Sequence, residues 1–84
     1  MSEYIATFHT HLAALLACRA LDTLGVNAKM MPVPRAVSSS CGTCVRYSAS
    51  RPHAETMGED AESIYIVCGG KKEEYELVTS FDGE

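Results

Sequence analysis

The chain has 84 residues, a hydrophobic fraction of 46% and a formal net charge of −4 at pH 7. A chain of this length forms one small domain, and this apolar content excludes an intrinsically disordered protein. No apolar run approaches the roughly 20 residues that a membrane-spanning helix needs. The first residues lack a basic segment followed by an apolar one, so we expect no secretory signal and a cytoplasmic protein with reduced thiols.

The charge is unevenly distributed along the chain. Residues 1–50 contain four basic and two acidic residues, whereas residues 51–84 contain three basic and nine acidic residues. The whole is too acidic for a nucleic-acid-binding domain, and no stripe of basic and aromatic residues is present. We expect the acidic C-terminal part to be a solubilising surface, while the mildly basic N-terminal half suits an anionic ligand.

Residues 3–33 predict a strand, a long helix and a second strand. The short apolar segment 3–8 favours a strand, and alternation over 26–33 predicts another. Between them, apolar residues recur at helical spacing over 12–24 and would form one face against a sheet. The residues expected on that face are Leu12, Ala13, Leu16, Ala17, Ala20, Leu21 and Leu24.

The ends of these elements carry recognisable signals. Thr10 is expected to cap the helix N-terminus through its hydroxyl. Gly25 is expected to end the helix in a left-handed conformation. Pro32 and Pro34 end the second strand, because proline cannot donate to a sheet ladder.

The second half of the chain predicts shorter elements. In chain order these are a strand over 44–48, a short second helix over 50–57, a strand over 63–67 and an edge strand over 74–78. Gly69 and Gly70 are expected to supply positive φ angles in a hairpin turn. Residues 79–84 are expected to fray.

The element order β-α-β-β-α-β matches the ferredoxin-like, or split β-α-β, plan. We therefore expect a single α+β domain over residues 1–84 with one long helix, a short second helix and an extra C-terminal edge strand. In that plan the loop between the second and third strands lies at the same end of the molecule as the N-terminus of the long helix.

That loop, residues 35–44, concentrates the reactive chemistry of the chain. Cys41 and Cys44 form a Cys-x-x-Cys pair, which in a reducing compartment favours redox, transfer or metal chemistry. The thiolate is the reactive form, and positive charge from Arg35 and from the helix N-terminus would favour it. We predict a nucleophilic Cys41 that accepts a transferred group, with Cys44 as the resolving thiol.

Other residues of the loop and of the helix start are candidates for supporting roles. Hydroxyl donors to a thiolate or oxyanion could come from the serine run, and a glycine between the thiols gives the backbone freedom. His11 lies at the helix start, at the same end of the predicted fold. The candidate ligand-binding residues are Arg35, Ser38, Ser39, Ser40, Gly42 and His11.

The loop and its flanks resemble the DUF3343 family of selenium/sulfur carrier-like proteins. The similarity covers residues 4 to about 48 and includes Thr10-His11-x-Ala13 and Gly25-Val26; its most specific element is Pro-Arg-x-x-Ser-Ser-x-Cys-Gly, here Pro34 to Gly42. The resemblance implies a ferredoxin-like fold, a role in moving sulfur or selenium, and Cys41 as the carrier cysteine. It also implies that Pro34, Arg35, Ser38 and Ser39 support that cysteine. The chain departs from the family pattern at Cys44 and in its shorter second helix.

Three functions remain open from the residues. The first is a carrier, rather than a turnover enzyme, that needs no cofactor, receives the chalcogen from a desulfurase-like donor and passes it to an acceptor protein. The second is a zinc- or iron-binding module in which Cys41 and Cys44 join His9 or His11. The third is an interaction domain without chemistry, and an exposed edge strand could in any case pair two copies in a homodimer. Cys18 and Cys68 are expected to be structural.

Overall fold

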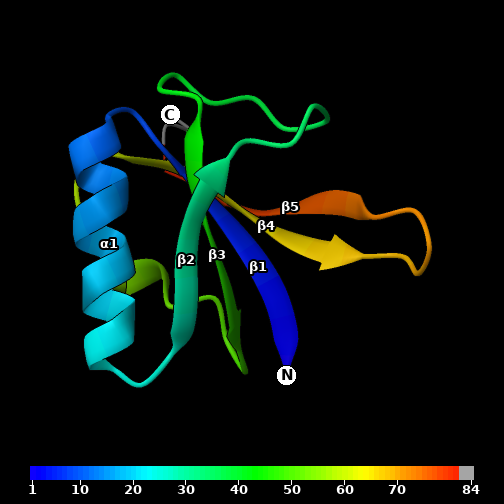
Figure 1. Cartoon of the computed structure of the whole chain (residues 1–84), viewed down its shortest axis with the longest axis horizontal. Coiled ribbons are helices and arrows are strands. Elements are labelled where there is room, and N and C mark those ends of the chain that lie inside the picture. Colours follow the sequence, from blue (N-terminus) through cyan, green and yellow to red (C-terminus); the bar gives the residue numbers. More distant parts are fainter. Residues whose placement is uncertain (82–84) are drawn as a thin grey trace.

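The computed structural model describes residues 1–81 and contains one α-helix and a five-stranded antiparallel sheet (Figure 1). The strands lie in the order β2-β3-β1-β4-β5. The elements are β1 (Ser2–Phe8), α1 (His11–Thr23), β2 (Asn27–Pro32), β3 (Thr43–Ala49), η1 (Ala54–Thr56), β4 (Ala61–Cys68) and β5 (Glu74–Ser80). No helix among these residues is long and apolar enough to span a membrane. The predicted α+β class with one long helix is thus confirmed.

The predicted second helix over 50–57 is wrong in extent. Only the 3-10 helix η1, Ala54–Thr56, forms in this segment. His53, the residue before it, has a positive φ of 57°, which a continuous α-helix cannot accommodate. The connection from β3 to β4 is therefore mostly irregular.

Both predicted caps of α1 are present. The Thr10 hydroxyl accepts a hydrogen bond from the backbone N–H of Ala13 at 3.0 Å. At the other end Gly25 has a φ of 82°, and the N–H of Val26 reaches the carbonyl of Leu21 at 2.9 Å. This is the Schellman arrangement, which satisfies carbonyls that the helix end leaves unpaired.

The predicted apolar face of α1 is correct for Ala17 and Leu21 but wrong for Leu12, Leu16 and Leu24, which are exposed. The helix buries Ala14, Ala17 and Leu21 against the sheet, whereas Leu12 and Leu16 are 61% and 56% exposed. Alanine side chains at the contact allow a close approach to the strands. Because leucine and alanine occupy most of the helix circumference, the spacing alone did not identify which side faces the sheet.

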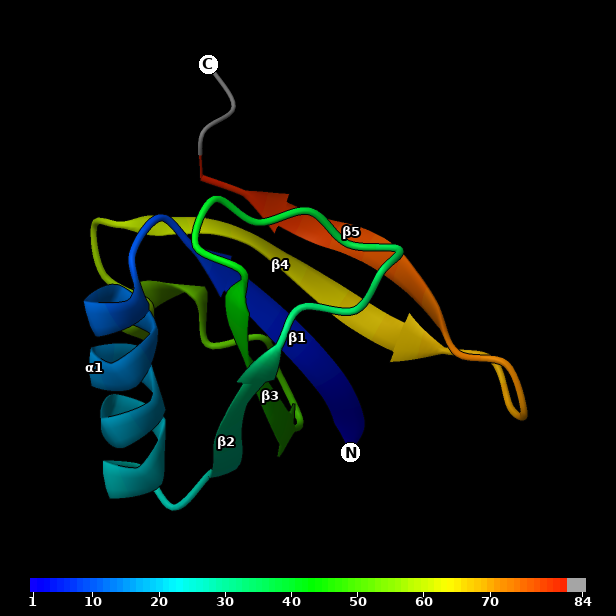
Figure 2. The ribbon, with the colours of Figure 1, turned by 45° about the horizontal axis from the view of Figure 1, so that its top comes forward.

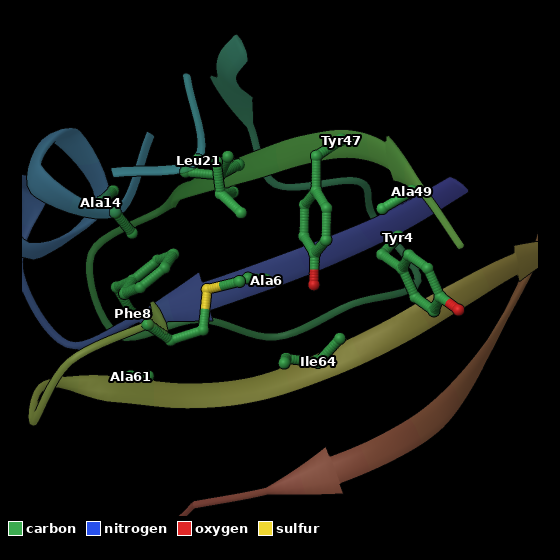
Figure 3. Close-up of a cluster of buried hydrophobic side chains, with 12 residues drawn as sticks. Tyr4, Ala6, Phe8, Ala14, Leu21, Tyr47, Ala49, Ala61 and Ile64 are labelled. Atoms are coloured by element: carbon green, nitrogen blue, oxygen red, sulfur yellow. The ribbon is translucent and has the colours of Figure 1, made fainter. Parts of the chain in front are cut away.

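The main core lies between α1 and the sheet (Figure 3). Phe8 from β1, Leu21 from α1 and Ile64 from β4 are fully buried there. Tyr4 and Tyr47 stack with their ring centroids 5.4 Å apart. Figure 3 shows labelled side chains of β1, β3 and β4 gathered in one cluster with Ala14 and Leu21 of α1, so this layer holds α1 on one face of the sheet.

A second buried layer lies on the opposite face of the sheet. Ile5, Thr7 and Cys44 have no exposed surface, yet they are not part of the core under the helix. Successive side chains of a strand point to opposite faces, so Ile5 and Thr7 face away from α1. The loop of residues 33–42, here called the thiol loop, crosses this side of the molecule (Figure 2) and contributes the buried Val37.

The β4–β5 hairpin extends away from the helix (Figure 1). Within it Gly69 has a φ of 87°, whereas Gly70 is not among the glycines with positive φ. The prediction of two left-handed glycines is thus correct for one. β5 is the predicted edge strand but reaches Ser80, so residues 79 and 80 do not fray; residues 82–84, which shared that prediction, lie outside the described part of the chain.

Replacing Leu21 by alanine should lower the free energy of unfolding by about 2–5 kcal/mol, because it leaves a cavity under the helix. The matched control is Leu16→Ala in the same helix, where an exposed side chain is shortened and a change below about 0.5 kcal/mol is expected. Urea denaturation followed by circular dichroism measures both. Equal losses in the two variants would show that the helix face is assigned wrongly.

Replacing Gly69 by alanine should destabilise the hairpin by about 1–3 kcal/mol, because of its left-handed backbone and the crowding of a new Cβ. That Cβ would lie 2.5 Å from the carbonyl oxygen of Lys72, whereas a Cβ on Gly70 would have no atom within 4 Å. Gly70→Ala is therefore the control, with an unchanged thermal midpoint. A hairpin that tolerates both substitutions equally would contradict this turn geometry.

Candidate thiol site

The thiol loop is closed at its base and anchored in its middle. The N–H of Val33 donates to the carbonyl of Gly42 at 3.1 Å, and the N–H of Val37 donates to the carbonyl of Pro34 at 3.0 Å. Val37 is 5% exposed and packs into the layer that covers β1. The loop is therefore a folded part of the structure, and most of its polar residues remain at the molecular surface.

Cys41 lies where this loop returns toward β3. Its side chain is half-buried, and its Sγ lies 3.5 Å from the carbonyl oxygen of Thr43, to which it can donate. The same sulfur lies 3.9 Å from the Ser39 hydroxyl. Gly42, with a φ of 75°, provides the left-handed residue on which the chain turns after the cysteine.

Ser39 connects this sulfur to the central strand. Its hydroxyl donates to the carbonyl of Phe8, at the end of β1, at 3.1 Å. A hydroxyl has one proton to donate but can accept two hydrogen bonds. While Ser39 is bound to Phe8 in this way, it can accept a hydrogen bond from the Cys41 thiol.

Ser40 makes the most extensive contacts in the loop. Its backbone N–H donates to Glu62 Oε1 at 3.1 Å, and its hydroxyl donates to Glu62 Oε2. The Nδ1 atom of His9 lies 3.3 Å from the same Oε2 and 3.5 Å from the Ser40 hydroxyl. The Glu62 carboxylate and the Ser40 hydroxyl both contact Nδ1 of His9. This cluster therefore differs from a catalytic triad, in which the carboxylate contacts one ring nitrogen of the histidine and the hydroxyl contacts the other.

The second cysteine of the pair is in a different environment. Cys44 begins the buried part of β3, has no exposed surface, and its thiol lies 3.8 Å from the carbonyl of Pro32. Burial raises the pKa of Cys44 to about 11, and nearby Cys41 adds to the rise while Arg46 opposes it. Although only two residues separate the two cysteines in sequence, the Cys41 thiol is half-buried and the Cys44 thiol is fully buried.

Among residues 1–81, neither Arg35, which was expected to favour the Cys41 thiolate, nor Arg46 on β3 forms a hydrogen bond with Cys41. The Arg46 guanidinium binds Glu73 at 3.1 and 3.0 Å and also binds Glu3. Arg35 is exposed, and within residues 1–81 it forms no hydrogen bond or ion pair. The positive charge of the loop is therefore exposed at Arg35, whereas that of Arg46 on the neighbouring strand β3 is balanced by Glu3 and Glu73.

The N-terminus of α1 lies beside the thiol loop, as predicted. His11 Nδ1 is 3.4 Å from the Thr43 hydroxyl, and His11, Gly42 and Thr43 line a shallow pocket of about 270 Å³ together with β2 residues. The first helical turn thus meets the residues that follow Cys41. Cys68 lies in the hairpin at the other end of β4, with its thiol 3.5 Å from the carbonyl of Glu74.

The predicted serines line a second depression. Ser38 is exposed, and with Ser39 and Ser40 it borders a shallow groove of about 360 Å³ that β4 completes with Glu62, Ser63 and Tyr65. All three serines therefore share one hydroxyl-rich surface beside Cys41. Glu62 was not among the residues singled out from the sequence, since an acidic residue in a strand of an acidic segment carries no local signal.

The histidines do not join the cysteines. His9 lies against Glu62 and Ser40, whereas His11 lies against Thr43. Within the described residues, no group of three or more His, Cys, Asp or Glu side chains is arranged to hold a metal ion. The zinc- or iron-binding alternative therefore finds no support in the geometry.

Cys18 and Cys68 are also free thiols. Desolvation is the main cause that raises the pKa of each.

Comparison with known proteins bears on the same region. A family model described as "Putative Se/S carrier protein-like" matches residues 3–66, which span β1 to β4 and include the whole thiol loop. Comparisons with curated proteins and with solved structures gave no match. Since the family model covers well over half of the chain, the protein belongs to the Se/S carrier protein-like family, DUF3343.

Proposed function

We propose that this protein carries sulfur or selenium on Cys41 as a persulfide or selenenyl sulfide. The observation that carries the proposal is the placement of Cys41, half-exposed between the Ser39 hydroxyl and the Thr43 carbonyl at the rim of the thiol loop. A transferable sulfur needs an accessible thiol, and Cys44 is fully buried. The family match supports this general role.

The loading step is a thiol exchange that requires no oxidant. The Cys41 thiolate attacks the outer sulfur of a donor persulfide, a new S–S bond forms on Cys41, and the donor leaves as its thiolate. The proton lost by Cys41 ends on the donor thiolate. Delivery is the same exchange with an acceptor thiol, so the protein acts as a carrier and not as a turnover enzyme.

Cys44 fits a slow resolving role. Attack of its thiolate on the inner sulfur of the Cys41 persulfide would give a Cys41–Cys44 disulfide and release hydrogen sulfide. Burial and a pKa of about 11 keep Cys44 largely protonated near neutral pH. A resolving thiol that reacts slowly prolongs the lifetime of the persulfide, which gives the carrier time to bind an acceptor protein.

The partners follow from the chemistry. A desulfurase-like protein would supply the sulfur or selenium, and a second protein would accept it, both in the cytoplasm. Two copies of the chain could also pair through the free edge of β5, which ends the sheet. Neither nucleic acid nor membrane takes part in this scheme.

We also infer that the fold is a ferredoxin-like variant. β3 is antiparallel to both β1 and β2, so β1 and β2 run parallel on either side of it. β1 likewise separates the parallel strands β3 and β4. This is the arrangement of a split β-α-β unit, with η1 in place of the second helix and β5 added at the edge.

Incubation with a cysteine desulfurase and cysteine should add about 32 Da, one sulfur atom, to Cys41. Cys41→Ser should abolish the adduct in intact mass spectra, whereas Cys68→Ser, at the far end of the sheet, should load like wild type. Peptide mapping identifies the modified residue. Absence of any adduct on Cys41 at all donor ratios would refute the proposal.

Native Cys44 should react with iodoacetamide at about pH 8 at least ~100-fold more slowly than Cys41, since burial and a high pKa leave few accessible thiolates. With a pKa of about 11, about one Cys44 in a thousand would be ionised at that pH. Unfolding in urea should bring the two rates together. Rapid native labelling of Cys44 would show that it is exposed and would undermine its slow resolving role.

A further inference from the structure

We propose that Glu62 is a positioning residue that holds the thiol loop so that Cys41 is presented in one fixed direction. The inference deepens the proposed carrier function and rests on it only for the role of Cys41. Glu62 lies on β4, which is paired along both edges, to β1 and to β5. A residue on such a strand is a rigid attachment point for a loop.

The contact is a two-pronged clamp on the residue directly before Cys41. One carboxylate oxygen of Glu62 accepts the Ser40 backbone N–H at 3.1 Å, and the other accepts the Ser40 hydroxyl. Only 14% of the Glu62 side chain is exposed, so water competes weakly for these bonds. Hydrogen bonds to an ionised acceptor are stronger than those between neutral groups.

His9 also contacts the Glu62 carboxylate that holds Ser40. Its Nδ1 lies 3.3 Å from the Oε2 atom that the Ser40 hydroxyl also contacts. His9 directly follows β1, so β1 and β4 both fix the carboxylate. The N–H of His9 donates to the carbonyl of Asp60 at 2.8 Å, which ties this junction to the start of β4.

The clamp matters because it restrains the residue next to Cys41. Arg35, Ala36 and Ser38 are exposed, and the other attachments of the loop are the backbone bonds of Val33 with Gly42 and of Val37 with Pro34, the buried Val37 and the bond from Ser39 to Phe8. Releasing Ser40 would free the chain just before Cys41, and the sulfur could then leave the Thr43 carbonyl. A donor protein that must approach Cys41 from one direction would then find its sulfur atom in several different positions.

The experiment compares Glu62→Ala with Glu59→Ala, an exposed acidic residue just before β4 that serves as a charge-matched control. Amide hydrogen exchange at Ser40 and iodoacetamide labelling of Cys41 are both measured in the folded protein. In Glu62→Ala, Ser40 protection should fall about tenfold and Cys41 labelling should rise about three- to tenfold, since local opening becomes easier. Glu59→Ala should match wild type in both.

Two further variants separate positioning from general destabilisation. Glu62→Gln keeps one acceptor for the Ser40 N–H but loses the charge and the second acceptor oxygen, so its changes should be smaller than those in Glu62→Ala. Ser40→Ala removes only the hydroxyl prong from an exposed residue and should give an intermediate labelling rate. If Glu62→Ala leaves both Ser40 exchange and Cys41 labelling at wild-type values, the inference is wrong.

Persulfide loading then links the clamp to function. Glu62→Ala should load more slowly from a desulfurase even though its Cys41 reacts faster with iodoacetamide. This opposite pair of changes would not arise from a purely structural role. Failure of wild type to load would refute the carrier proposal alone, whereas unchanged exchange and labelling in Glu62→Ala would refute the clamp alone.

Discussion

The need to cover both faces of β1 organises this small protein. β1 is the middle strand of the sheet, and five of its consecutive residues, from Tyr4 to Phe8, are buried. Helix α1 and the η1 connection, through Ala54 and Met57, cover one face. The thiol loop crosses the other face (Figure 2), where Ile5 and Thr7 are fully buried, and its own Val37 is buried too, so the segment that carries the chemistry also helps to cover the sheet. Structure and reactivity are therefore coupled in one loop.

This constraint makes the two cysteines of the pair unequal. β3 begins at Thr43, so Cys44 follows strand alternation and points into the face that the loop covers, beside Thr7 in the register of β1. Cys41 precedes the strand and stays at the rim. The start of β3 therefore divides the two thiols of the Cys-x-x-Cys pair.

The sequence allowed the element order, the helix caps and the location of the thiol loop to be predicted, because these depend on local signals. Thr10 acts through its own hydroxyl and Gly25 through its own backbone geometry, and Pro32 ends its strand wherever the strand packs. Features that depend on tertiary contacts were missed. The expected helix face contained both Leu16 and Leu21, but only Leu21 is buried against the sheet. Which of the two side chains is buried depends on what the sheet can accommodate.

The candidate site shows the same division. Cys41 and the serines could be singled out because reactive and polar residues gather in one segment. Glu62 could not, since its importance comes from β4 lying beside the loop, 22 residues away from Ser40 in sequence. The ion pair of Arg46 with Glu73, far along the chain on the β4–β5 hairpin, was likewise not predictable, because it depends on the hairpin lying beside β3.

These contacts indicate that hydrogen bonds, more than concentrated positive charge, define the surroundings of Cys41. The thiol can donate to Thr43 or to Ser39, and both are held by the sheet or by its end. Once the sulfur is ionised or carries a second chalcogen, it has lost the proton that made those bonds. The Ser39 hydroxyl can then turn from the Phe8 carbonyl toward the sulfur, since a single rotation about its side chain exchanges one acceptor for the other.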